Sequence, residues 1–586
     1  MKEIPEDADL RRQWNALALN AQQPQVFLTY EWALAAYRSY QATLKPLLFL
    51  GYEGNDLCAL AALATDPSGK RTSFLCATTG DYCDFLSAPE HREEFVVGVL
   101  AELRRQNVGE MVFANLPADS GTAKVLRNLS GASGYRIFAR TGYVCAQVSL
   151  SALERRGDAK PVLPRKKMLR RFLNAMGREA PVRLDHARSW DAIQETLPEF
   201  VQAHVARFLV TGRISNAARP ERREFLAELA RLLSESDWVV LTRMMSGTKV
   251  FAWNYGFQFQ GTWFWYQPTF VNDLEKYSPG FCLLAKLIEE AADDPTVKTL
   301  DLGLGAEEYK DRFANQTREI LYVTAHASAA RHYREIFRYH AAEILRVSPP
   351  MEAAARGLRQ GWRRLRNRWA MSGATATFAW LARRARELFW LECEVFFYEW
   401  CGTAPSRSSA QTLLQLDLSV LADATSQHID DDATLGYLLR AATRIQEGQA
   451  EGFALVDADG KVLHFAWATT FEGFFLSELQ AKVQSPSPDS VMLFDCWTPA
   501  AAVGHGYYAQ TVDLIAEQVQ EKGGRPWIFS AAGNAASIRG LGKTGFQRRY
   551  SLIRRRLLGW DRVTGETPKS ESARSEIAPG AENSAA

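Results

Sequence analysis

Two kinds of hydrophobic pattern alternate along the first 155 residues. Residues 46–50 and 58–64 are short apolar runs of strand length, separated by a polar Glu-Gly-Asn-Asp turn. Residues 95–106 instead place apolar side chains at the spacing of one helix face, and 110–113 is again strand-like. This alternation predicts a mixed α/β unit.

The same alternation returns in residues 165–327. Residues 249–258 and 262–270 are predicted to be two strands that flank a Gln260-Gly261 hairpin turn, and residues 297–302 are predicted to be a third strand. Between them, apolar residues follow the i, i+3, i+4, i+7 rule of a helix face, at Leu284, Leu287, Ile288 and Ala291. A second α/β unit is therefore predicted here.

A third α/β unit is predicted over residues 410–560. Residues 453–456 and 462–469 form a hairpin around an Asp-Ala-Asp-Gly turn, and 491–496 and 527–530 are further strands. A helix with one apolar face separates the last two strands; that face carries Tyr508, Val512, Ile515, Ala516 and Val519.

These patterns divide the chain into a first half-unit at 1–160, a second at 161–327, a helical connector at 328–400, a C-terminal unit at 401–562 and a disordered tail at 563–586. The connector alternates arginines with tryptophan and phenylalanine. Its plainer interpretation is a solvated helical link, and the alternative is a peripheral contact with an anionic lipid or glycan surface.

Composition is that of a globular protein, with 47% hydrophobic and 23% charged residues. The net charge of +2 gives no overall field that would favour DNA as a partner. The eight cysteines form no CxxC pair and no metal-binding spacing with histidine, so we expect reduced thiols in a cytoplasmic protein and no metal site. The acidic N-terminus is unlike a signal peptide, and no apolar run is long enough to span a membrane.

Two segments place small residues where a predicted strand gives way to a helix. One is Ser278-Pro279-Gly280 and the other contains Gly504 and Gly506. Backbone N–H groups at a helix start can bind a diphosphate, although serine and proline are also ordinary first residues of a helix. The segments are therefore candidate cofactor-binding sites.

Several titratable residues are candidates for chemistry. His204 has an intrinsic pKa suited to proton transfer, although a buried helix histidine is the plainer interpretation. Asp301 ends a predicted strand and could be a general base or a local hydrogen-bonding partner. Tyr309 and Lys310 follow the next glycine-rich turn, and ligands bind beyond strand ends in α/β sheets, so a cofactor or substrate contact is favoured there.

Candidate substrate-binding residues are Asp81, Asp84 and Tyr277. The two aspartates bracket aromatic residues, and we expect them in a loop between the first two half-units. The chain shows neither a Ser-His-Asp order nor the surroundings of a reactive cysteine, so no acyl-enzyme is expected.

The C-terminal unit resembles the GNAT acetyltransferase superfamily. The resemblance rests on a strand, a loop Ala501-Ala502-Val503-Gly504-His505-Gly506, a helix, and then Asn534 with Gly545-Phe546. The family pattern has arginine or glutamine where this chain has Ala501, which puts cofactor affinity there in doubt. The resemblance implies that Gly504, Gly506 and Asn534 face an acyl-CoA.

The first 325 residues resemble the tandem GNAT-like acetyltransferases of the cellulose-biosynthesis (CelD/BcsL-like) type, which are related in fold to Fem-type peptidyltransferases. The residues that carry the resemblance are the block 80–86, the basic segment 165–171, His204 with Arg207 and Arg213, Tyr277–Gly280 and the block 301–310. The resemblance implies an α/β (α+β) fold class with three GNAT-like mixed sheets flanked by helices, the first two fused in tandem.

The activity implied by these resemblances is transfer of an acyl group, in particular acetyl, from acyl-CoA to an amine or hydroxyl of a small molecule or glycan. A polysaccharide acceptor in the cell envelope follows from the resemblance alone. Two alternatives remain open: an aminoacyl-tRNA-dependent transferase, for which the basic segments at 165–171 and 356–368 could hold tRNA, and a non-catalytic adaptor, favoured by Ala501.

Overall fold

The computed structural model describes residues 1–129, 133–150, 165–305, 307–346, 390–402, 411–448, 450–557 and 560–565. The chain divides into two compact units. The first comprises Met1–Arg207 and Ser215–Val347, and the second Phe208–Ile214 and Ser348–Ala586. Among the described helices, none combines the length and the apolar character that crossing a membrane requires.

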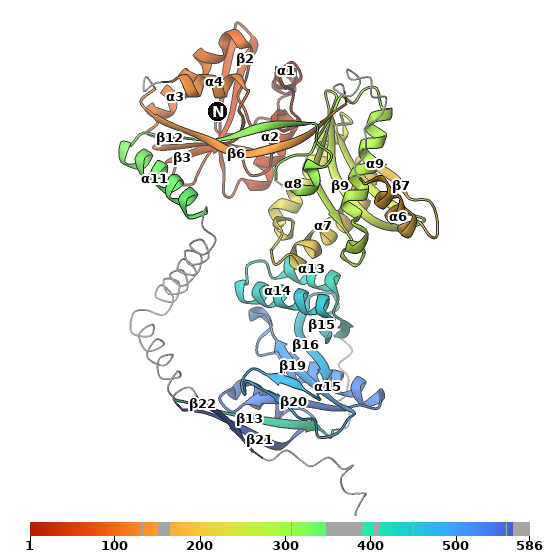
Figure 1. Ribbon diagram of the computed structural model, residues 1–586. Coiled ribbons are helices and arrows are strands. Elements are labelled where there is room, and N and C mark those ends of the chain that lie inside the picture. The colour runs from red at the N-terminus through yellow and green to blue at the C-terminus, as the bar shows by residue number, and fades with distance from the viewer. Residues whose placement is uncertain are drawn as a thin grey trace, which may run out of the picture. The chain divides into compact units, whose positions relative to one another are not determined.

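The first half of the first unit (Figure 1, red to orange) alternates helices and strands as the pattern predicts. Its elements are α1 (Ala8–Leu19), α2 (Tyr30–Tyr40), β1 (Lys45–Glu53), β2 (Asp56–Thr65), β3 (Arg71–Phe74), β4 (Leu86–Ser87), α3 (Arg92–Arg105), β5 (Glu110–Pro117), α4 (Gly121–Asn128) and β6 (Arg136–Ser149). Thr29 caps α2 by accepting a hydrogen bond from the Trp32 N–H, and that helix buries Trp32 completely.

The second half repeats this alternation (Figure 1, yellow to green). Its elements are α6 (Lys166–Met176), β7 (Arg183–Ala187), α7 (Trp190–Val210), α8 (Pro220–Ser234), β8 (Val239–Ser246), β9 (Lys249–Phe259), β10 (Thr262–Phe270), the 3-10 helix η4 (Asn272–Tyr277), α9 (Pro279–Asp293), β11 (Thr299–Asp301), α10 (Glu308–Asp311), β12 (Gln316–His326) and α11 (Ala329–Arg346). The apolar face predicted for α9 is buried at all four of its positions.

One twelve-stranded sheet runs through both halves. Its order is β1-β2-β3-β5-β12-β6-β11-β10-β9-β8-β7, with β4 paired to β2. The halves exchange their last strands, because β12 lies beside β5 and β6 lies beside β11. Figure 1 shows the resulting long β6–β12 pair running through both halves. The two sheets expected here are therefore one continuous sheet, which fixes each half against the other.

Each half contains two parallel strands that pair over only three residues and separate beyond that point, an arrangement called here an opened pair. In the second half, β10 and β11 pair only over Thr262–Phe264, while β10 continues to Phe270. In the first half, β3 and β5 pair over three residues, and β5 runs on to Pro117. A helix connects each pair, α9 and α3 respectively. The ends of β10 and β11 thus diverge on the side where α9 begins.

The C-terminal unit is an eight-stranded sheet with the same opened pair. Its elements are β13 (Trp390–Trp400), β14 (Thr412–Gln415), α13 (Leu418–Gln427), α14 (Asp432–Glu447), β15 (Glu451–Val456), β16 (Val462–Thr470), β17 (Phe474–Leu476), β18 (Ala481–Val483), β19 (Ser490–Trp497), α15 (Tyr507–Glu521), β20 (Arg525–Ala531), α16 (Ala535–Leu541), β21 (Phe546–Leu557) and β22 (Trp560–Thr564). The parallel strands β19 and β20 pair over four residues only, and Asp495 has a left-handed backbone (φ 45°) beyond that point.

The strand order of this unit is β14-β15-β16-β19-β20-β13-β21-β22, with β17 and β18 as a separate hairpin. β13 lies between β20 and β21, as β6 lies between β11 and β12 in the first unit. The sheet therefore begins at 390, ahead of the boundary expected at 401. Of the connector, α11 is described, while the arginines at 356–386 and the tail beyond 565 lie outside the described residues.

Candidate functional site

Asp301, the last residue of β11, is the centre of a buried hydrogen-bond group. Its carboxylate accepts hydrogen bonds from the Tyr82 hydroxyl at 2.8 and 2.7 Å, from Gln147 Nε2 at 2.7 Å and from the Gly303 N–H at 2.9 Å. Burial raises the pKa of Asp301, and the Tyr82 hydrogen bond opposes that rise. Both oxygens of Asp301 accept hydrogen bonds, and the residue is 1% exposed. Asp301 therefore links Tyr82 of the first half, Gln147 of β6 and Gly303 of the turn after β11.

Asp81 lies beside this group. A Cβ atom on Gly303 would stand 2.5 Å from Asp81 Oδ2, so the carboxylate occupies the space that glycine leaves open. Burial, and then the charge of Asp301, raise the pKa of Asp81 to about 7, while Lys310 and the Leu304 N–H oppose the rise. Asp81 is half-buried, and a carboxyl group with a raised pKa is a candidate for proton transfer.

Lys310 is buried at the first turn of α10, with 4% of its surface exposed. Its ammonium donates a hydrogen bond to the Leu304 carbonyl at 3.1 Å and pairs with Glu307 at 3.1 Å. Lys310 therefore points back over the turn that follows β11 and places a positive charge near Asp81. The neighbouring Tyr309 accepts a hydrogen bond from Trp265 Nε1 at 3.4 Å, and burial raises the pKa of Tyr309.

Arg222 on α8 brings a second buried cation to the same place, with 3% of its surface exposed. Its Nη2 donates to the Tyr266 hydroxyl at 2.8 Å, and Tyr266 in turn donates to the Thr79 carbonyl. Nε and Nη1 have no partner of normal hydrogen-bond geometry among the described residues, although the Tyr40 hydroxyl lies nearby. Arg222 is close enough to Asp81 to lower its pKa.

These contacts define a junction cluster, where segments far apart in the sequence meet between the two halves of the first unit. Its members are Asp81, Tyr82, Gln147, Arg222, Asp301 and Lys310. Three of the six were sequence candidates: Asp81, Asp301 and Lys310. Tyr82 lies in the block 80–86 that carries the resemblance, but it was not itself a candidate. Gln147 and Arg222 have no motif around them: the pairing of β6 with β11 places Gln147 opposite Asp301, and Arg222 comes close to Asp81 from α8.

The start of α9 forms the second part of the site. Ser278 is the N-cap with a left-handed backbone (φ 46°), and its side chain makes no capping hydrogen bond. Non-glycine residues in this conformation are strained, and such strain concentrates at functional positions. Pro279 is the first helical residue, and the space beside Gly280 faces Phe270 at 3.4 Å. The N–H groups of this first turn, which the Ser278 side chain does not cap, are therefore candidates for binding an anion.

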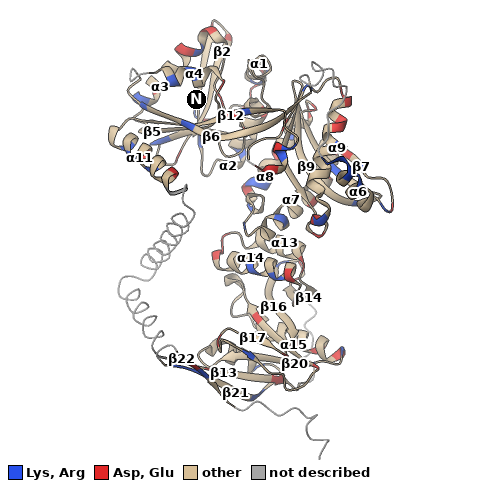
Figure 2. Ribbon diagram, viewed as in Figure 1, with Lys and Arg blue, Asp and Glu red and all other residues tan. Residues whose placement is uncertain are grey.

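The helix start and the turn after β11 are neighbours. The ring of Phe281, in the first turn of α9, packs on Phe313 just after α10, with centroids 4.8 Å apart. On the other side, Tyr277 packs on Phe172 of α6. Figure 2 shows Lys and Arg gathered on α6, and Lys166, Lys167, Arg170 and Arg171 are all exposed there. A positively charged helix thus lies against the segment that leads into α9.

Two candidates lie in other surroundings. His204 is buried on α7 with Nδ1 2.8 Å from Ser215 Oγ, and burial lowers its pKa to about 3. So low a pKa is poorly matched to proton transfer at neutral pH, and these contacts fit a core histidine. Asp84 accepts a hydrogen bond from the Phe85 N–H at 2.8 Å and lies 3.8 Å from Arg92. It belongs to a network within the first half.

In the C-terminal unit, Gly504 and Gly506 have left-handed backbones (φ 92° and 84°), and nothing stands within 4 Å of a Cβ placed on either. Gly506 is the N-cap of α15, and no side chain caps that helix. Asn534 is itself a helix cap, accepting a hydrogen bond from the Ser537 N–H at 3.1 Å at the start of α16. The loop is thus open, while Asn534 has a structural partner.

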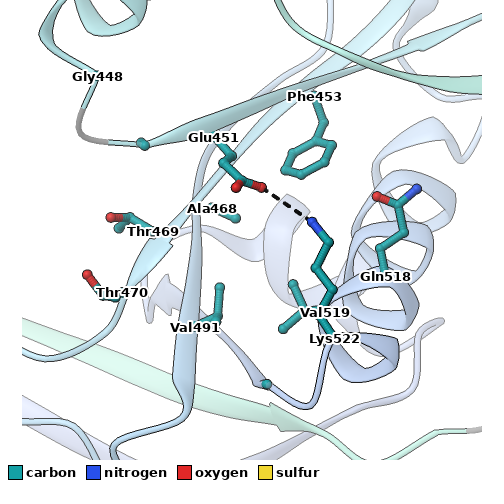
Figure 3. A pocket seen from close by; sticks show the side chains of 12 residues that line it. Gly448, Glu451, Phe453, Ala468, Thr469, Thr470, Val491, Gln518, Val519 and Lys522 are labelled. Carbon is teal, nitrogen blue, oxygen red and sulfur yellow. Dashed lines mark ion pairs between the residues drawn. The ribbon is translucent and has the colours of Figure 1, made fainter.

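The C-terminal unit also contains a cavity of about 450 Å³. Figure 3 shows Phe453, Val491 and Val519 at its apolar side and the Glu451–Lys522 ion pair, 3.8 Å long, at its edge. Gln518 and Lys522 belong to the last turn of α15 and its end, whereas the Gly504–Gly506 loop precedes the first turn. The cavity therefore lies at the opposite end of α15 from the candidate diphosphate loop.

Gly303 offers a structural test of the junction. Gly303 has φ 69°, and an alanine Cβ there would meet Asp81 Oδ2 at 2.5 Å and the Trp265 carbonyl at 3.3 Å. We expect Gly303→Ala to lower the free energy of unfolding by at least about 1–2 kcal/mol from the backbone alone, measured by denaturant titration. Gly54→Ala, at φ 61° in open space, is the matched control and should show only the backbone part. Equal losses for both variants would contradict the close packing at Gly303.

One family model matches the second half of the first unit. Residues 164–311 match the family model described as an acetyltransferase (GNAT) domain. The matched region includes α6, the opened β10–β11 pair, α9 and the turn that carries Lys310. This match supports, for the second half, the superfamily that the sequence predicted. A comparison with curated proteins found no match.

Three solved structures are similar to part of this chain at low sequence identity. The C-terminal domain of a putative lysylphosphatidylglycerol synthetase from Agrobacterium fabrum is 12% identical, with a TM-score of 0.37, over 56% of this chain and 95% of that one. FemX is 10% identical, with a TM-score of 0.39, over 53% and 95%. A tandem GNAT protein of the clavulanic acid biosynthesis pathway is 13% identical, with a TM-score of 0.31, over 55% and 96%.

Proposed function

We propose that this protein transfers an acyl group, acetyl in the first instance, from acyl-CoA to an amine or hydroxyl acceptor, with the working site in the first unit. The observation that carries the proposal is the opened β10–β11 pair. Within the region that matches the GNAT model, it places the uncapped start of α9 beside the turn of the junction cluster.

The start of α9 suits the diphosphate of a coenzyme A. The first-turn N–H groups and the helix dipole favour a negative charge there. Ser278 leaves those groups free because its own side chain does not cap them. The exposed lysines and arginines of α6 add positive charge next to η4, the segment that leads into the helix. A thioester extending from this point along the opened pair would run towards the end of β11.

Asp81 is the residue that we assign to proton transfer. A general base works best when its pKa lies near the operating pH, and that of Asp81 is about 7. Asp301 already accepts hydrogen bonds on both oxygens, so we assign it to positioning Tyr82 and the turn at Gly303. In the step itself, the acceptor nitrogen or oxygen attacks the thioester carbonyl, Asp81 takes the acceptor proton, and the C–S bond breaks to release the CoA thiolate.

The proposed acceptor class rests on Arg222 and on the resemblance seen in the sequence. Among the described residues, two buried nitrogens of Arg222, Nε and Nη1, have no partner of normal hydrogen-bond geometry, and their N–H groups suit a hydroxyl, carboxylate or other oxygen of an acceptor. A sugar of a polysaccharide carries such oxygens, and the resemblance to cellulose-biosynthesis acetyltransferases points the same way. A glycan acceptor is accordingly the form of the proposal that we favour.

An aminoacyl-tRNA donor is the second candidate, because the exposed cations of α6 would also suit a nucleic-acid backbone. The two donors can be separated with the full-length chain, by calorimetry with acetyl-CoA and by filter binding with aminoacyl-tRNA at increasing salt. We expect saturable acetyl-CoA binding in the micromolar range and release of free thiol when an acceptor is added. Tight tRNA binding that weakens steeply with salt, together with no acetyl-CoA binding, would establish the second donor instead.

A further inference from the structure

Helix α11 carries a stripe of large apolar side chains that face solvent. Tyr333, Phe337 and Ile344 are 65%, 73% and 68% exposed. At 100° per residue, these three positions fall within about 40° of one another around the helix axis, so they form one continuous line. We call this line the α11 stripe.

The opposite face of α11 holds the helix on the sheet. Tyr339 packs on Phe138 of β6, with ring centroids 5.7 Å apart, and on Arg140 at 5.3 Å. His332 is buried there beside His326 of β12. Because the helix is anchored through this face, the α11 stripe is directed outwards.

Positive charge borders the stripe on one side. Arg334 and Arg338 each follow a stripe residue by one position, 100° further round the helix, and both are exposed. The whole helix contains four arginines against two glutamates. The sequence beyond the helix continues to alternate arginine with tryptophan and phenylalanine. Apolar and aromatic side chains beside a cationic flank are the signature of a helix that lies in the interface of an anionic bilayer.

We propose that α11 is a peripheral docking surface for an anionic lipid membrane, with the α11 stripe inserted among the lipids and Arg334 and Arg338 against their headgroups. The positive charge of Arg334 and Arg338 favours an anionic membrane over a second copy of the chain. Two copies in contact would bring the same arginines together, and their charges would repel. The surface is separate from the junction cluster, so the proposal holds whichever acyl donor the protein uses. Docking of this kind would place acyl transfer at a membrane surface.

Vesicle co-sedimentation of the full-length chain tests the proposal. We expect binding to phosphatidylcholine vesicles that contain phosphatidylglycerol, and little binding to phosphatidylcholine alone. Phe337→Ser should lower the vesicle partition coefficient at least about tenfold, because a whole phenylalanine side chain no longer enters the bilayer. Arg334→Gln and Arg338→Gln should each lower it about fivefold, as expected for one cation near an anionic surface.

Matched controls are available elsewhere on the surface. Phe475 is 54% exposed in the C-terminal unit and Arg127 is exposed on α4, so Phe475→Ser and Arg127→Gln should leave vesicle binding unchanged. Binding that ignores lipid charge, or that Phe475→Ser weakens as much as Phe337→Ser, would overturn the proposal. So would a drop in molar mass from dimer to monomer on Phe337→Ser in light scattering, since the stripe would then join two copies.

Discussion

Asp81→Asn is expected to lower kcat for acyl transfer by about 10²–10⁴-fold, the range that loss of a general base gives. An amide keeps the shape of the carboxyl group and can still accept the Leu304 N–H, but it cannot take a proton from the acceptor. The measurement is thiol release from acetyl-CoA with a panel of amines, amino sugars and hydroxyl acceptors. Acetyl-CoA affinity should stay within about twofold of wild type, because Asp81 is not placed at the diphosphate.

The same variant should be at least as stable as wild type above neutral pH. The pKa of Asp81 is raised from an ordinary value of 3.8 to about 7 in the folded protein. The unfolded chain therefore loses this proton first, and the folded state loses stability as pH rises from about 4 to 7, by up to about 4 kcal/mol at 1.36 kcal/mol per pH unit. Asparagine removes that loss. A variant that is inactive and also strongly destabilised at pH 8 would point to a structural role for Asp81.

Lys310→Met provides the companion pH test. The positive charge of Lys310 opposes the rise in the pKa of Asp81, so its removal should raise that pKa further. The limb of kcat/KM that increases with pH should then move to higher pH, whereas full activity should return in alkaline buffer. A pH profile that coincides with that of wild type would separate Lys310 from the proton-transfer step.

The elements with strong local patterns were predictable, and those whose pattern depends on distant partners were not. The hairpin β9–β10, the helix α9 and the strand β11 followed directly from periodicity and turn residues. The strands β6 and β12 did not. β6 has a partly exposed first part and a buried second part, because it leaves one half of the sheet and enters the other. No local rule signals such a strand exchange.

The candidate site likewise contains residues that a local pattern identifies and residues that only the fold identifies. Asp301 and Lys310 stood out because a strand end and a glycine-rich turn precede them. Arg222 gave no signal, since it lies in an ordinary amphipathic helix and only its burial beside Tyr266 makes it notable. His204 carried the right chemistry in sequence, but its surroundings lower its pKa to about 3. The sequence thus identified groups that turn geometry positions, whereas the burial that shifts their pKa values is seen only in the folded structure.

Repetition of one layout gives the chain two candidate diphosphate sites. The segment before α9 and the loop before α15 both follow the first strand of an opened parallel pair, and both helices lack a side-chain cap. The loop before α15 has Ala501 in place of the arginine or glutamine of the family pattern. The backbone geometry would allow a nucleotide to bind at either site. Substitutions that introduce a negative charge at one site or the other can show which of them binds it.

Gly280→Asp is expected to abolish most acetyl-CoA binding, with a dissociation constant raised at least about tenfold, by placing a carboxylate where the diphosphate should lie. The substitution suits the helix itself. An acidic residue in the first turn interacts favourably with the helix dipole by about 0.3–1 kcal/mol, and a side chain at this position meets only Phe270, at ordinary contact distance. Lost binding together with an unchanged or higher melting temperature would therefore report an anion site. Calorimetry and thermal unfolding of the full-length chain give the two readings.

Val503→Asp is the matched variant in the C-terminal loop. Val503 is 62% exposed next to Gly504, so a new carboxylate there disturbs no packing and would repel an anion held at the start of α15. We expect this variant to bind acetyl-CoA as wild type does, because the proposal places the donor in the first unit. The reverse pattern, with Gly280→Asp silent and Val503→Asp defective, would move the donor site to the C-terminal unit. It would leave the junction cluster without a thioester beside it, and Asp81 could not then be the base of the reaction.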